Sequence, residues 1–158
     1  MFGFLQRRPE HPRMTQMRQL GLFATLRPKE LRVIDGLLYE RRYLKGEIVF
    51  DEGEEGQALY VVLSGTVMIC RKSDAGIVPV AEIPTGSLFG ELALLWGAPR
   101  SAQARAVDDC VLAALSRADF DTLTENHAAI ATKIAMQLAR DLGQKLSARY
   151  LALNTQPV

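Results

Sequence analysis

An acidic and a basic residue flank a short apolar segment in the stretch "FGELALLWGAPRSA", residues 89–102. Glu91 precedes Arg100, and most of the residues between them are apolar. The planar guanidinium of an arginine can bind a phosphate group through two parallel hydrogen bonds. A carboxylate cannot bind phosphate, but it accepts hydrogen bonds from sugar hydroxyl groups. The pair therefore indicates a small ligand that carries an anion and a hydroxyl group close together.

The segment from Glu91 to Gly97 has the composition of two helical turns that end at a glycine. A helix N-terminus presents unpaired backbone N–H groups and the positive end of the helix dipole, which favour an anion. Gly90 lets a ligand approach the backbone closely, and Ser101 adds a hydroxyl or an N–H donor. These residues predict an anion-binding cassette.

Simpler interpretations exist for the same residues. Glu91 and Arg100 could form a structural salt bridge with no ligand between them. Trp96 could stack on a base, but its place late in the segment favours packing within the protein. We expect Leu94 and Leu95 to make core or hinge contacts.

The elements around the cassette follow from hydrophobic spacing. Residues 12–38 have helical spacing, and residues 41–115 consist of short β-prone runs separated by glycine-containing turns. A helix of about Asp119 to Leu153 follows, with an apolar stripe. The pattern predicts a mainly β protein with flanking helices: a β jelly-roll barrel with N-terminal helices, the short cassette helix and a long C-terminal helix. We expect one domain, residues 12–158, after a flexible and locally basic N-terminal arm, residues 1–11. The apolar stripe of the C-terminal helix consists of Ile130, Ile134, Leu138, Leu142 and Leu146. The basic residues near the N-terminus are Arg7, Arg8, Arg13 and Arg18.

Composition narrows the function. The 158 residues are 48% hydrophobic with a net charge of +1, so nothing indicates a strong attraction to nucleic acid. No apolar run approaches the roughly 20 residues of a membrane span, and we expect a cytoplasmic protein. Cys70 and Cys110 lie far apart in apolar runs, as reduced core thiols do. His11 and His127 are isolated, so we predict neither a metal site nor an enzyme.

From about Leu22 to Leu146 the sequence resembles the cyclic nucleotide-binding domain family. The resemblance rests on three stretches in order: "YLKGEIVFDEGEEGQALYVVLSGTV" (43–67), "IPTGSLFGELALL" (83–95) and "PRSA" (99–102). It implies a β jelly roll whose cassette holds a 3′,5′-cyclic nucleotide, with no further cofactor. Glu91 would then bind the ribose 2′-hydroxyl and Arg100 the cyclic phosphate. Together with their neighbours in the cassette, these residues give the expected ligand-binding set. It consists of Phe89, Gly90, Glu91, Leu92, Ala93, Arg100, Ser101 and Ala102.

The resemblance leaves the choice of base open. In relatives, alanine after the arginine goes with cAMP and threonine with cGMP, whereas Ser101 is compatible with either. Bacterial members carry a base-contacting threonine on the long helix, where this chain has Lys145. Because a long cation or a leucine can cap a purine, Lys145, Leu146 and Arg149 are candidate lid residues.

Two functions remain. In the first, the chain is a stand-alone cyclic nucleotide receptor for cAMP or cGMP that signals to an unidentified effector protein through its C-terminal helix. In the second, a binding-silent jelly roll acts as a dimerisation or scaffolding module. A homodimer through the C-terminal helix fits either function. The chain stops at Val158 without the DNA-reading helix of bacterial relatives, so we expect no direct contact with nucleic acid.

Overall fold

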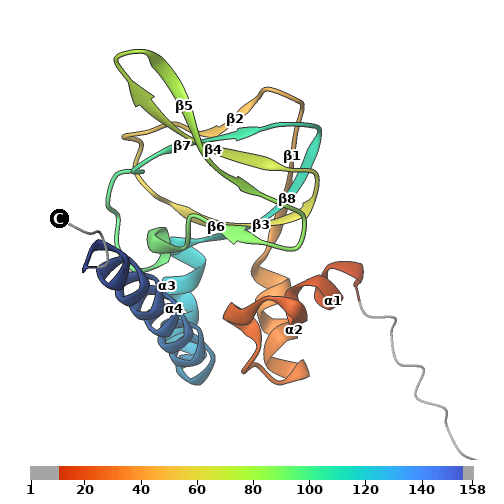
Figure 1. Ribbon diagram of the computed structural model, residues 1–158. Helices are drawn as coiled ribbons and strands as arrows, with labels where there is room; N and C mark the ends of the chain where they lie inside the picture. The colour runs from red at the N-terminus through yellow and green to blue at the C-terminus, as the bar shows by residue number, and fades with distance from the viewer. Residues whose placement is uncertain (1–10, 155–158) are drawn as a thin grey trace, which may run out of the picture.

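The computed structural model describes residues 11–154 and consists of two β-sheets with helices on one side (Figure 1). The predicted arm, residues 1–11, lies outside the described residues except for His11. The strands are β1 (Tyr39–Tyr43), β2 (Ile48–Phe50), β3 (Ala58–Ser64), β4 (Val67–Ser73), β5 (Gly76–Ile83), β6 (Leu88–Phe89), β7 (Gln103–Ala106) and β8 (Cys110–Ser116). The helices are α1 (Pro12–Gln19), α2 (Pro28–Leu37), α3 (Arg117–Asn126) and α4 (Ala128–Asn154), with the 3-10 turns η1 (Gly21–Phe23) and η2 (Glu91–Leu94).

The strands form two antiparallel four-stranded sheets in the orders β1-β8-β3-β6 and β2-β7-β4-β5. Except for the hairpin of β4 and β5, neighbours in each sheet come from distant parts of the chain; for example, Tyr39 pairs with Ala114 and Val67 with Ala106. The sheets pack face to face, as in a jelly roll. The predicted fold class is therefore confirmed.

Alternation along β3 divides the core into two parts. Leu59 and Val61 face the helices, whereas Tyr60 and Val62 lie between the sheets. This period of two is the one expected for a strand that is buried on both faces. Figure 1 shows the helices gathered against the sheet that contains β3 and β6. The same sheet therefore supports the helices on one face and the cassette at its edge.

Ion pairs connect α1 to α2 and α2 to α4. Arg13, one of the basic residues named near the N-terminus, is largely buried and pairs with Asp35. Glu30 on α2 accepts hydrogen bonds from Nζ of Lys133 on α4 at 2.8 and 3.0 Å. These bonds, together with hydrogen bonds from the backbone N–H and the side chain of Arg27, hold the pKa of Glu30 at about 2, below its usual 4.5. The pair of Glu30 and Lys133 therefore connects the N-terminal helix α2 to the C-terminal helix α4.

The predicted long C-terminal helix is confirmed as α4, but it begins at Ala128 and not at about Asp119. The backbone of His127 leaves the helical region, with φ −138° and ψ 56°, and divides the segment into α3 and α4. The carbonyl of His127 then accepts hydrogen bonds from the N–H groups of Ile130 and Ala131, which start α4. The helical spacing of apolar residues continues from α3 into α4, so the sequence pattern does not indicate that the backbone leaves the helix at His127. No helix within residues 11–154 is long and apolar enough to cross a membrane.

Candidate functional site

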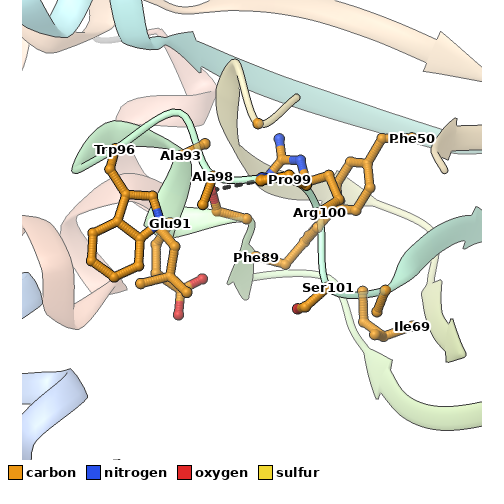
Figure 2. Close-up of a pocket in the computed structure, with 14 residues that line it drawn as sticks. Phe50, Ile69, Phe89, Glu91, Ala93, Trp96, Ala98, Pro99, Arg100 and Ser101 are labelled. Carbon is orange, nitrogen blue, oxygen red and sulfur yellow. Dashed lines mark hydrogen bonds between the residues drawn. The ribbon is translucent and has the colours of Figure 1, made fainter. Parts of the chain in front are cut away.

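A cavity of about 410 Å³ lies beside the cassette, at the edge of the sheet that contains β6 (Figure 2). The segment from β6 to the start of β7 provides most of its wall, and β2, β4 and the loop before β3 provide the rest. Its lining residues are Phe50, Gly56, Ile69, Phe89, Gly90, Glu91, Leu92, Ala93, Trp96, Ala98, Pro99, Arg100, Ser101 and Ala102. All eight cassette residues named from the sequence therefore line a single cavity.

The cassette helix is shorter than the two turns predicted. It is the single 3-10 turn η2, and it ends before Gly97. Gly97 is not a left-handed helix cap; a Cβ there would lie only 2.3 Å from Nη1 of Arg117. The glycine in the left-handed conformation is Gly90, with φ 76°, at the start of the turn. A Cβ on Gly90 would lie 2.7 Å from Nη1 of Arg100, so this glycine makes room for the arginine.

The guanidinium of Arg100 is held in the wall of the cavity by neutral groups. Nη2 donates a hydrogen bond of 2.6 Å to the carbonyl of Ala58, and Nη1 donates one of 3.2 Å to the carbonyl of Gly90. Its central carbon lies 4.0 Å from the centre of the Phe50 ring. Burial lowers the pKa of Arg100 from its usual value. Nε is buried and has no hydrogen-bond partner among the described residues.

Arg100 forms no salt bridge with a carboxylate within residues 11–154. In Figure 2 its guanidinium points toward Phe50 and away from the carboxylate of Glu91. The alternative in which these two residues form a structural ion pair is therefore wrong. The cavity wall contains a half-buried cation that forms no salt bridge with a carboxylate of the described residues, and such a cation favours an anionic ligand.

The carboxylate of Glu91 instead accepts a hydrogen bond of 3.0 Å from Nζ of Lys145 on α4. The Glu91 side chain is 18% exposed and the Lys145 side chain 66% exposed. Both residues also line a second groove, between α4, η1 and β6. The later half of α4 thus contacts the cassette through the ion pair between Lys145, which is exposed, and Glu91.

None of the three lid candidates, Lys145, Leu146 and Arg149, lines the cavity beside the cassette. Leu146 is 71% exposed, and Arg149 is exposed as well. Trp96 also differs from its prediction, because it does not pack into the core: it is 59% exposed and lines the cavity. Leu94 is buried as predicted, but Leu95 is 43% exposed. A one-turn cassette is too short to bury the residues that follow it.

Two supporting residues carry no signal in the sequence. Phe50 lies in an ordinary β-prone run, and nothing in that run indicates that its ring would meet Arg100. Arg117 pairs with Glu55 at 2.8 Å and lies against Gly97, so it ties the end of the cassette to the start of α3. Its role is hidden in the sequence because its partners come from distant loops.

Comparison with known proteins adds a family model described as "Cyclic nucleotide-binding domain", which matches residues 40–127. The cyclic AMP receptor protein of Thermus thermophilus is 39% identical over 127 residues, which are 80% of this chain and 59% of that protein. The lysophospholipase NTE1 of Chaetomium globosum is 32% identical over 117 residues, 73% of this chain but 8% of that enzyme. Among solved structures, the regulatory domain of Toxoplasma gondii PKA with cAMP has a TM-score of 0.65 and 33% identity. That match covers 69% of this chain and 42% of the other.

The chain spans less than two thirds of either curated relative. A segment of this kind therefore occurs in a receptor protein and within a much longer enzyme. The receptor and the enzyme each contain a segment similar to this chain, but the remainder of their sequences lies outside the match.

Proposed function

The chain belongs to the cyclic nucleotide-binding domain family, and from this premise we propose that it binds a 3′,5′-cyclic nucleotide, cAMP or cGMP, and acts as a regulatory sensor. The observation that carries the proposal is the pair of polar groups on one cavity. Arg100 is a desolvated cation without a carboxylate partner among the described residues, and Glu91 is a hydrogen-bond acceptor on the same wall. A scaffolding module requires neither group.

The cyclic phosphate would bind at Arg100 and at the start of η2. The guanidinium supplies charge-assisted hydrogen bonds, and the buried Nε is one donor that still lacks a partner within residues 11–154. The backbone around Gly90 and Leu92, together with Ser101, would complete the contact. A relative with 33% identity was solved with cAMP, which supports a cyclic nucleotide as the ligand.

The ribose 2′-hydroxyl would donate a hydrogen bond to Glu91. That carboxylate accepts a hydrogen bond from Lys145, so the ligand must share it with the lysine or displace it. A nucleotide therefore acts on the contact through which α4 meets the cassette.

The response of α4 follows from this exchange. A ligand that contacts α4 in only one position shifts the helix toward that position, by as much as its differential affinity allows. Only the first half of α4 contributes buried residues, the last of them Leu138. The second half can therefore move without disturbing the core and can transmit occupancy to an effector protein. In this proposal the domain itself is not an enzyme.

A second candidate function is supported by the exposed end of α4. Leu146, Tyr150, Leu151 and Leu153 are each at least 63% exposed. Such a run of apolar side chains on one helix suits a helix of a second copy, as in a dimerisation or scaffolding module. A homodimer through this helix is compatible with either function, whereas nucleotide binding is expected only of the sensor.

Isothermal titration separates the proposals. We expect cAMP to bind with one site per chain, cGMP to bind somewhat more weakly and 5′-AMP to bind far more weakly. Failure of both cyclic nucleotides to bind, in a protein shown to be folded by circular dichroism, would leave only the scaffolding function.

A further inference from the structure

Two aromatic rings lie near the guanidinium of Arg100, and a third ring packs against both of them. Phe50 is nearest, with its centre 4.0 Å from the central carbon of Arg100, and Tyr60 follows at 6.0 Å. Phe89 completes the group, 5.9 Å from Phe50 and 5.3 Å from Tyr60. The rings come from β2, β3 and β6, and none is more than 9% exposed. Phe50 is therefore held firmly in the core between the sheets.

An aromatic ring holds a cation in a way that an acid cannot. A carboxylate at this position would neutralise Arg100 and compete with an anionic ligand. The face of a ring attracts the guanidinium but leaves its full positive charge available. The attraction is greatest where the cation is desolvated, as Arg100 is.

The backbone carbonyls of Ala58 and Gly90 supply the remaining contacts. These carbonyls fix two nitrogens at the edge of the guanidinium, and the Phe50 ring lies within 4.0 Å of its central carbon. The side chain thus has little freedom left to lose when a ligand binds, which lowers the cost of binding.

We propose that Phe50 is a positioning residue for phosphate recognition, which holds the Arg100 guanidinium in place in the cavity wall without neutralising its charge. This inference rests on the proposed function, because it concerns the phosphate of the cyclic nucleotide. It assigns a role to a residue outside the cassette that does not itself contact the phosphate.

The test is a titration with cAMP of the wild type, Phe50→Leu, Phe50→Met and Phe50→Tyr. Leucine and methionine preserve an apolar side chain but remove the aromatic face, so we expect about a tenfold loss of affinity for each. Tyrosine retains the face and should restore binding to within about twofold of the wild type. Two non-aromatic variants keep the test valid if one of them fails to fold.

Phe120→Leu provides the matched control. Phe120 is 5% exposed and belongs to the helix-side core, away from the cavity. It should lose stability in thermal unfolding as Phe50→Leu does, but retain wild-type affinity. In an Arg100→Lys background, Phe50→Leu should cost about twofold or less, because a lysine does not stack on a ring as a planar guanidinium does.

The possible failures can be distinguished. If the wild type binds cAMP and Phe50→Leu binds as well as Phe120→Leu, this inference is wrong and the proposed function stands. An undiminished effect of Phe50→Leu in the Arg100→Lys background also overturns the inference, since the ring would then act on something other than the guanidinium. If the wild type binds neither cAMP nor cGMP, the proposed function fails and this inference fails with it.

Discussion

Arg100 and Glu91 should contribute unequally to binding. Arg100→Ala removes the cation that pairs with a desolvated phosphate, and we expect a loss of about 3 to 5 kcal/mol in the free energy of cAMP binding. Glu91→Ala removes hydrogen bonds to a hydroxyl group and should cost about 1.5 to 3 kcal/mol. Titration calorimetry of both variants measures the difference. Unchanged affinity in Arg100→Ala would refute the assignment of the cassette.

A ligand variant checks the role of Glu91 independently. Because 2′-deoxy-cAMP lacks the hydroxyl assigned to this carboxylate, it should bind the wild type about as weakly as cAMP binds Glu91→Ala. The Glu91→Ala variant, in turn, should not distinguish the two ligands. A clear preference of this variant for cAMP over the deoxy ligand would place the 2′-hydroxyl elsewhere.

Ser101 should tune the choice of purine. The residue is exposed, lines the cavity and lies next to Arg100, the residue proposed to bind the phosphate. We expect cAMP to be preferred by the wild type, and Ser101→Thr to shift the ratio of the two dissociation constants toward cGMP. Ser101→Ala is the matched control and should shift the ratio the other way. An unchanged ratio in both variants would show that the base is selected elsewhere.

Among the elements, α4 divides into a structural half and a half available for signalling. Truncation after Gly143 retains all four buried residues, Ile130, Ala131, Ile134 and Leu138. The shortened chain should therefore fold, with a small change in Tm. It should bind cAMP more weakly, because the contact of Lys145 with the cassette is gone, and any dimer should be lost. Calorimetry and light scattering measure both effects, and full-strength binding by a folded truncated chain would exclude α4 as a lid.

The connection between α2 and α4 should make stability depend on pH. Hydrogen bonds from Lys133 and from Arg27 lower the pKa of Glu30 to about 2 in the folded state, against 4.5 as the ordinary value. The stabilisation by the ionised carboxylate is therefore complete above pH 4.5 and is lost as the pH falls toward 2. Glu30→Gln lacks this contribution.

Urea unfolding of the wild type and Glu30→Gln between about pH 7 and pH 3 tests the connection. We expect the wild type to be more stable near neutral pH and its advantage to shrink below pH 4.5. Glu125→Gln, on the exposed side of α3, is the control and should show no such advantage. A difference between wild type and Glu30→Gln that stays constant with pH would mean that the pair does not stabilise the fold.

For the whole molecule, the sequence predicts the core strands and the main helices because burial leaves a hydrophobic pattern in them. The apolar run from Leu59 to Leu63 indicates a strand, and its side chains alternate between the two parts of the core. The break at His127 leaves no such pattern, since both helices continue the same apolar spacing and only the backbone changes direction.

The sequence predicts which cassette residues line the cavity, but not which partners orient their side chains. The spacing of Glu91 and Arg100 correctly indicates that they share a cavity. The partner of each depends on residues far away in the chain: Lys145 for the acid, Ala58 and Phe50 for the arginine. The prediction for Trp96 was wrong for a related reason, because the length of the cassette turn decides whether this side chain is buried.

Hydrogen exchange with and without saturating cAMP tests most directly the claim that nucleotide binding at the cassette is transmitted to α4. We expect slower exchange in two separate segments, residues 89–102 and residues 142–153, with little change in β1 and β8. Protection confined to residues 89–102 would leave binding in place but contradict transmission through α4. No change in residues 89–102 would contradict the account as a whole.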